Sequence, residues 1–187
     1  MVLMLTIGVS FAVGRSTSPD AAPTNTSVEA GFARDMAVHH SQAVDMAERI
    51  RKRSSDEMLG YLTADIVLTQ QAQIGQMGAW LDLWGLTRVS VGQRAMAWSG
   101  MSMSGEMPGM ASRVQINLLD TLPVDQAEVR FLQLMIAHHK GGVHMAQMAL
   151  ALHPNDTVAR LARSIVTAQQ SEITAMTGML KDRGAKP

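Results

Sequence analysis

The segment FARDMAVHHSQAVDMAERI, residues 32–50, recurs in altered form as FLQLMIAHHKGGVHMAQMA, residues 131–149. The two segments begin 99 residues apart, and each carries a leading phenylalanine, a His-His pair and a methionine on either side of that pair. The same offset aligns apolar and glutamine positions of residues 62–81 with those of residues 161–180. Matches sustained over one offset indicate that a unit was duplicated within the chain.

Each copy of the repeat has the apolar periodicity of two helices joined by a short turn. Helices joined by short turns pack side by side in opposite directions, so two hairpins predict an all-α, antiparallel four-helix bundle. Capping-box spacings mark expected helix starts at Thr26–Glu29, Ser54–Glu57 and Asp125–Glu128. The expected helical domain covers residues 28–183, with repeats 28–84 and 124–183 and a connector of residues 86–123, which is long for a bundle loop and is expected to lack regular structure.

Length and composition fit one helical domain and exclude several classes of function. The 187 residues are enough for one core, and 4% aromatic residues with 16 methionines favour helix over sheet. The 16 basic and 16 acidic residues balance and form no basic stripe, which argues against nucleic-acid binding. The chain has no cysteine, so disulfides, thiolate metal sites and cysteine catalysis are excluded.

The N-terminal segment predicts export from the cytoplasm. Residues 2–14 are uncharged and apolar, a length typical of the hydrophobic part of a signal peptide and short for a membrane-spanning helix. Residues 15–27 are rich in Pro, Ser, Thr and Asn and predict a flexible linker. We therefore expect residues 1–14 to be a signal peptide or a membrane anchor, and the domain to be extracytoplasmic, either secreted or tethered through this segment alone. The alternative is an apolar tail on a cytoplasmic protein.

Helical geometry places both His-His pairs on the side of their helix that faces the core. At about 100° per residue, each pair falls inside an apolar stripe about 120° wide. His144 falls outside the stripe of its helix and is expected to be exposed. The candidate metal ligands on the two stripes are Met36, His39, His40 and Met46 in the first copy, and Met135, His138, His139 and Met145 in the second.

The partner helices carry polar residues on their own core-facing stripes. Gln70 and Gln73 lie there in the first copy, and Gln169 and Glu172 in the second. Gln70 and Gln169 are expected at the depth of the histidines across the hairpin turn. Because buried polar groups need partners, we expect a polar layer midway along the bundle. The layer is either a hydrogen-bonded His–Gln network that only stabilises the bundle, with methionine as core filler, or a metal site of imidazole and thioether ligands oriented by these polar residues. Imidazole and thioether together favour copper, especially in the cuprous state.

Methionines are also concentrated in the connector, in the segment AMAWSGMSMSGEMPGMAS of residues 95–112. Their spacing among Gly, Ser and Pro is not that of a helix facing a core. Flexible thioethers can bind a cuprous ion without cysteine, whereas the alternative is an apolar flap over one end of the bundle. The candidate ligands in this segment are Met101, Met103, Met107 and Met110.

The His motifs and the methionine-containing connector together resemble the domain-of-unknown-function 305 family over about residues 30–180. The motif Phe-x3-Met-x2-His-His-x2-Ala-Val-x-Met-Ala begins at Phe32, and its main features recur in the second copy. The resemblance implies a ferritin-like four-helix bundle, a bacterial exported protein and, from some family members, copper binding or copper resistance. By matching position, the resemblance implies that His39, His40, His138 and His139, with their neighbouring methionines, are the functional residues of the motif.

Two differences between the copies depart from a symmetric family pattern. Gln73 of the first copy stands where the second copy has Glu172. Gly141-Gly142 replaces Gln42-Ala43, which is expected to loosen the second His helix locally. We therefore expect the two halves to bind a metal unequally.

These features predict an extracytoplasmic protein whose partner is a metal ion and which buffers or chaperones copper. The rival, from another class, is a non-catalytic structural or interaction bundle whose histidine layer binds nothing. An enzyme is not expected, because no Ser-His-Asp arrangement, Gly-rich phosphate loop or acidic pair lies on a shared face. Self-association into a homo-oligomer is left open.

Overall fold

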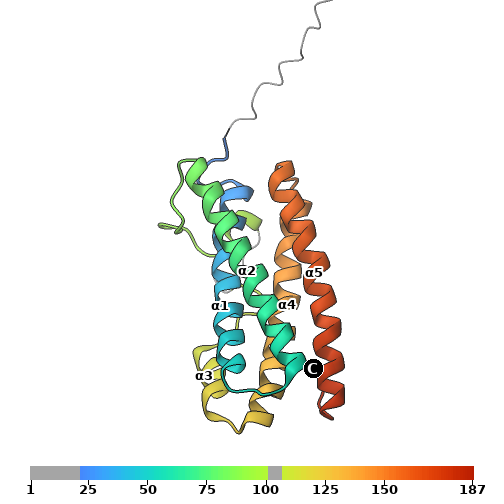
Figure 1. The fold of residues 1–187 in the computed structure, drawn as a ribbon. Helices are drawn as coiled ribbons and strands as arrows, with labels where there is room; N and C mark the ends of the chain where they lie inside the picture. The colour runs from blue at the N-terminus through green and yellow to red at the C-terminus, as the bar shows by residue number, and fades with distance from the viewer. Residues whose placement is uncertain (1–21, 101–106) are drawn as a thin grey trace, which may run out of the picture.

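The computed structural model describes residues 22–100 and 107–187, and the regular structure within them is helical (Figure 1). The predicted signal segment, most of the predicted linker, Met101 and Met103 lie outside the described residues. No helix of the described ranges is long and apolar enough to cross a membrane. The helices are α1 (Val28–Arg51), α2 (Glu57–Leu83), the short 3-10 helix η1 (Ala97–Ser99), α3 (Arg113–Thr121), α4 (Val124–Ala151) and α5 (Asp156–Asp182).

The four long helices form the predicted bundle of two hairpins. α1 packs against α2 and α4 packs against α5, while α1 and α4 meet along the centre of the bundle (Figure 1). α1 runs antiparallel to both α2 and α4, and residues 84–123 carry the chain from the end of α2 to the opposite end of the bundle, where α4 begins. A single long crossover is typical of ferritin-like bundles. The predicted all-α antiparallel four-helix bundle is confirmed.

The helix starts differ from the predicted capping boxes. Ser27, not Thr26, caps α1, and Asp56, not Ser54, caps α2. α4 follows Pro123 and has no side-chain cap. The three predicted capping boxes are therefore wrong, because neighbouring Ser, Thr and Asp residues can each cap a helix and the path of the backbone selects among them.

The connector contains regular structure, which corrects the expectation of a long unstructured loop. Besides η1 it holds α3, which opens with a capping box formed by Ser112 and Gln115. Ile116 and Leu119 of α3 are buried, and the helix packs against both α1 and α4. α3 therefore covers the end of α1 and the start of α4 (Figure 1).

Two apolar clusters fill the interior, one toward each end of the bundle. The cluster nearer α3 includes Ile50, Leu59 and Phe131, and the other includes Phe32 and Leu81. Both His-His pairs are buried, yet neither pair belongs to either cluster. The histidines therefore form a polar layer between two apolar cores, as the helical geometry predicts.

Candidate metal centre

The four paired histidines meet where α1 crosses α4. All four side chains are completely buried. The rings of His39 and His138 lie face to face, with centroids 3.8 Å apart and planes 33° apart. His40 and His139 flank this central pair, with centroids 6.5 Å from His39 and 6.3 Å from His138 respectively. The duplication thus brings its two copies of the motif into one continuous layer of four rings.

Three of these rings bind an oxygen atom through Nε2. His39 Nε2 lies 3.0 Å from the backbone carbonyl oxygen of Pro108. His40 Nε2 lies 2.7 Å from Oε1 of Gln73, and His139 Nε2 lies 2.6 Å from Oε2 of Glu172. Carbonyl and carboxylate oxygens accept hydrogen bonds, so each Nε2 carries the proton and donates it. In a neutral imidazole the lone pair then lies on Nδ1, which is the arrangement of many metal-ligating histidines.

Several buried polar atoms of the layer have no hydrogen-bond partner among the described residues. They are Nδ1 of all four histidines, Nε2 of His138, and the amide nitrogen and oxygen atoms of Gln70 and Gln169. Buried polar atoms are rarely left unpaired in folded proteins, so a concentration of them needs an explanation. A bound cation that accepts the lone pairs of imidazole nitrogens is one such explanation.

The predicted pairing of the histidines with Gln70 and Gln169 is wrong. Gln73 and Glu172 are the residues that reach His40 and His139, one helical turn further along α2 and α5. Helical periodicity places both Gln70 and Gln73 on the core-facing stripe of α2, and the estimate of depth from the hairpin turn favoured Gln70. The repeat also supports Gln73, because it occupies the position of Glu172 at the 99-residue offset.

Burial lowers the pKa values of three histidines of the layer, His39, His40 and His138. Desolvation lowers the pKa of His39 to about 4, against a partly opposing hydrogen bond to Pro108. It lowers the pKa of His40 to about 3, with a further decrease from the neighbouring charge of His39. The pKa of His138 is also lowered well below 6.5, again chiefly by desolvation. At neutral pH these imidazoles therefore keep a lone pair that a metal ion could accept.

The four predicted methionines lie on the two sides of the histidine layer. Met36 and Met145 belong to one apolar cluster, and Met46 and Met135 belong to the other. All four side chains are completely buried, so each contributes to the packing of the core whether or not it also binds a metal. Their role as ligands stays a prediction. Across residues 22–100 and 107–187, no group of three or more His, Cys, Asp or Glu side chains converges in a metal-binding arrangement.

The connector crosses the bundle at the level of the histidines. Gln42 holds it with two hydrogen bonds, donating from Nε2 to the Ala111 carbonyl at 3.0 Å and accepting at Oε1 from the Ala111 N–H at 2.7 Å. On the α4 side, Pro108 and Gly109 lie against Gly141 so closely that a Cβ on Gly141 would stand 2.0 Å from the Pro108 oxygen. Met107 and Met110 border this crossing and are partly buried.

The packing around the second His motif explains why glycine occupies both of these positions. Gly141 admits the backbone of the connector, and a Cβ on Gly142 would stand 2.4 Å from Oε1 of Gln169. Both glycines are buried in α4. The expectation that Gly141-Gly142 loosens this helix stays a prediction, and the structure adds that neighbouring atoms fill the space that a side chain would occupy.

The start of the connector is held by two buried charged residues that sequence analysis did not single out. Arg34 donates to the backbone oxygens of Thr87, at 2.8 Å, and Asn25, at 2.9 Å. Asp35 Oδ2 accepts from the Met96 N–H at 2.7 Å and from Trp98 Nε1 at 2.9 Å. Desolvation raises the pKa of Asp35 in spite of these bonds. The connector is thus fixed to α1 both before and after the segment that lies outside the described residues.

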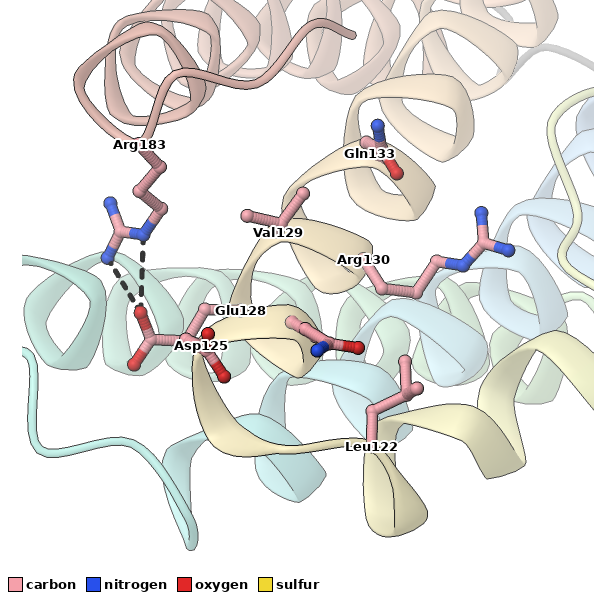
Figure 2. A pocket seen from close by; sticks show the side chains of 8 residues that line it. Leu122, Asp125, Glu128, Val129, Arg130, Gln133 and Arg183 are labelled. Carbon is pink, nitrogen blue, oxygen red and sulfur yellow. Dashed lines mark hydrogen bonds and ion pairs between the residues drawn. The ribbon is translucent and has the colours of Figure 1, made fainter.

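A surface pocket of about 480 Å³ lies away from the histidine layer, between the start of α4 and the end of α5 (Figure 2). Arg183 stands at its edge and bonds Glu128, at 3.0 Å, and Asp56, at 2.6 Å. None of the unpartnered buried polar atoms of the described residues lies in this pocket. The Arg183 network ties the two hairpins together, and the pocket shows no comparable feature that would bind a ligand.

Fold and site define a duplicated four-helix bundle with a buried histidine layer between methionine-containing cores. The chain belongs to the family described as Domain of unknown function (DUF305), which matches residues 29–180. The predicted family membership is therefore confirmed. No curated protein matches the chain.

Solved structures of this family and beyond share the fold. A candidate secreted DUF305 protein from Streptomyces coelicolor is 47% identical, with 87% of this chain and 98% of that one covered and a TM-score of 0.82. A DUF305 fragment from Deinococcus radiodurans is 39% identical, with coverages of 88% and 99% and a TM-score of 0.72. CopM in a Cu(I)-bound form is 23% identical, with coverages of 86% and 97% and a TM-score of 0.62. CopM structures with Cu(II) and with silver show the same fold.

Proposed function

We propose that the protein binds copper ions outside the cytoplasm and buffers or chaperones them without catalysing a reaction. The observation that carries the proposal is the set of completely buried imidazole nitrogens with no hydrogen-bond partner among the described residues. Burial lowers the pKa values of His39, His40 and His138. His39, His40 and His139 each donate Nε2–H to an oxygen atom, which leaves the lone pair on Nδ1 available to a cation. Buried methionine sulfurs above and below the layer are the soft ligands that favour the cuprous ion.

The ligand set is expected to mix imidazole and thioether. No three His, Cys, Asp or Glu side chains of the described ranges converge on one point, so a site of histidines alone would require side chains to move. For the cuprous ion we favour two imidazoles of the central pair, His39 and His138, together with sulfurs of Met36 and Met145 or of Met46 and Met135. For the cupric ion we add the flanking imidazoles of His40 and His139, which lie beside that pair. CopM, a distant relative by fold, binds Cu(I), Cu(II) and silver, which are ions that such a set accepts.

The rival function, a purely structural layer, fits the hydrogen bonds less well. A network built only to stabilise the bundle would pair its buried donors and acceptors, because each unpaired group costs about 1–3 kcal/mol. Among residues 22–100 and 107–187, five imidazole nitrogens have no hydrogen-bond partner, and neither do the side-chain amides of Gln70 and Gln169 in the same bundle. An extracytoplasmic location follows from the apolar N-terminal segment and agrees with the description of the Streptomyces coelicolor relative.

Copper titration tests the proposal directly. Residues 22–187, which keep the Asn25 contact of Arg34, are titrated with cuprous and cupric ions in competition with a chelator. We expect the double variant His39→Leu, His138→Leu to bind cuprous ion at least about 100-fold more weakly, because two ligands are lost. His144→Leu, which changes an exposed histidine of α4, is the control and should bind as the unaltered protein does.

Three outcomes count against this function. Copper binding no tighter than that of free histidine and methionine would refute the proposed function. Unchanged affinity in the double variant would remove the layer from the site. Loss of affinity only in a Met107→Leu, Met110→Leu variant would show that the metal site lies in the connector. The histidine layer would then have a structural role alone.

The two halves of the layer should bind copper unequally. Glu172 gives His139 a carboxylate partner, whereas His40 has only the neutral amide of Gln73. A carboxylate makes an imidazole a stronger electron-pair donor to a metal. Glu172→Gln is therefore expected to weaken cupric binding by about 10- to 100-fold, and Gln73→Glu to strengthen it. Equal affinities of the unaltered protein and Glu172→Gln, measured by the same competition, would show that the asymmetry has no part in binding.

A further inference from the structure

All four rings of the histidine layer are completely buried, so a metal ion can reach them only if a part of the fold opens. The turn of residues 107–110 in the connector, which we call the cover turn, lies over the central pair of rings. Its Pro108 oxygen accepts the 3.0 Å bond from His39 Nε2, and a Cβ on Gly109 would stand 3.0 Å from the Cα atom of His138. The cover turn therefore lies between the central rings and solvent.

The sequence Met-Pro-Gly-Met explains why the chain turns here. Proline followed by glycine is typical of a type II turn, which needs a positive φ at the position of the glycine. Gly109 has a φ of 77°, and the Met110 N–H donates to the Met107 oxygen at 3.4 Å across the turn. Because the cover turn carries this hydrogen bond within itself, it can move as one unit.

Polar contacts, rather than buried apolar side chains, hold the cover turn in place. Its residues are only partly buried, and where they border the apolar clusters they do so from outside. Gln42 holds the adjoining Ala111 through two hydrogen bonds, and His39 supplies a third through Pro108. Gly141, which occupies the position of Gln42 in the second copy, makes room for the turn. Segments with few buried apolar contacts open most readily, so breaking these three bonds frees the turn.

Surface cavities lie on both sides of the cover turn. One of about 390 Å³ is lined in part by Gln42, Asp45 and Met110. The other, of about 230 Å³, is lined in part by Asp35 and Met107. The turn therefore has space beside it, and each cavity brings one of its two methionines to the surface.

The other approach to the layer, between α2 and α5, is closed more firmly. Gln73 and Glu172 stand there, each bonded to a flanking histidine ring. Above and below them, both helices contribute buried side chains to both apolar clusters, namely Ile66 and Met77 of α2 and Ile165 and Met176 of α5. Parting these two helices would expose apolar core surface, whereas lifting the cover turn breaks hydrogen bonds that water can replace.

We propose that the cover turn is the gate of the metal site, that copper ions enter and leave the histidine layer beneath it, and that Gln42 sets the rate of this exchange. The inference rests on the proposed function. Met107 and Met110, at the two ends of the turn, offer thioethers to an entering cuprous ion before the imidazoles receive it. The gate closes again over the loaded site, because ligation through Nδ1 leaves the bond from His39 Nε2–H to Pro108 in place.

Copper exchange kinetics test the gate. Stopped flow follows the transfer of cuprous ion from a coloured chelator complex to the protein, and its release to excess chelator. In Gln42→Ala both rates should rise by about tenfold or more, because two bonds of the closed state are lost. The loss affects free and loaded protein alike, so the dissociation constant should change by less than about threefold. The control is Gln133→Ala, which removes a similar bond, from a partly buried glutamine of α4 to the Lys186 oxygen.

Chemical labelling of the metal-free protein locates the opening without copper. Diethyl pyrocarbonate, a small electrophile that modifies imidazole nitrogens, is applied to low occupancy, and tandem mass spectrometry finds the labelled histidines. The central pair should be labelled before His40 and His139, and all four more slowly than the exposed His144. Gln42→Ala should speed labelling of the central pair by about tenfold, whereas Gln133→Ala leaves it unchanged. Circular dichroism checks that both variants fold.

The outcomes separate the gate from the proposed function. Labelling of His40 and His139 first would place the opening between α2 and α5, and equal labelling of the four rings would mean access by global unfolding. Either result overturns the gate. Copper binding with unchanged exchange rates in Gln42→Ala would also overturn the gate and leave the proposed function intact. A protein that binds no copper, yet is labelled first at the central pair, would refute the proposed function and with it the copper route.

Discussion

Lowering the pH from 7 to 5.5 should destabilise the metal-free protein steeply. The pKa of His39 is lowered to about 4 and that of His40 to about 3, and the pKa of His138 is lowered well below its ordinary value, all chiefly by desolvation. In the unfolded chain these histidines titrate near pH 6.5, so below that pH the unfolded state binds protons that the folded state does not. Their contribution is complete above pH 6.5 and is lost as the pH falls toward the folded pKa values. The free energy of unfolding should fall by about 1.4 kcal/mol per pH unit for each histidine, or roughly 4 kcal/mol for the three.

Urea unfolding at a series of pH values, with a chelator present, measures this slope. The range from pH 7 to 5.5 keeps most carboxylates ionised, so the histidines dominate the change. The variant His39→Leu, His138→Leu should have a much shallower slope, whereas His144→Leu, at an exposed site, should keep the full slope. A stability that does not change over this range would show that the buried imidazoles take up protons in the folded state.

Replacing Gly141 by alanine should destabilise the protein and release the connector. The new Cβ would stand 2.0 Å from the Pro108 oxygen and 2.8 Å from the Gly109 nitrogen, and both are backbone atoms that cannot rotate away. Displacing this segment also strains the hydrogen bond from His39 to Pro108 and the two bonds from Gln42 to Ala111. Overpacking of this kind costs about 1–3 kcal/mol, more than the helix propensity that alanine adds.

Gly178→Ala is the matched control for this substitution. Gly178 also lies inside a long helix, but a Cβ there meets nothing within 4 Å. Alanine should therefore stabilise the protein at this position by about 0.5–1 kcal/mol. Thermal unfolding gives the sign of each change, and limited proteolysis of the connector reports its release in Gly141→Ala. Two changes of the same sign would mean that the close approach of Pro108 to Gly141 does not constrain the fold.

The 99-residue repeat was sufficient to predict the architecture. It predicts two hairpins, the burial of His39, His40, His138 and His139 and the exposure of His144, because the direction of a side chain around a helix follows from local geometry alone. The helix ends were predicted within a few residues, but not their caps. At the start of α1 the adjacent Thr26 and Ser27 are nearly equivalent in chemistry, and only the backbone path distinguishes them.

The partners of the histidines depend on packing between distant segments. Gln70 and Gln73 lie one helical turn apart on adjoining faces of α2, and a small rotation of the helix selects which one reaches His40. The part of the connector before α3 has no periodicity from which its path could be predicted, so the bond between His39 and Pro108, 69 residues apart, was not foreseen. From the sequence, Gly141 is only a residue of low helix propensity in α4. In the folded chain its missing side chain makes room for the backbone of Pro108 and Gly109 in the connector. Local periodicity therefore establishes which side chains enter the core, whereas the atoms they meet follow from how the helices and the connector pack together.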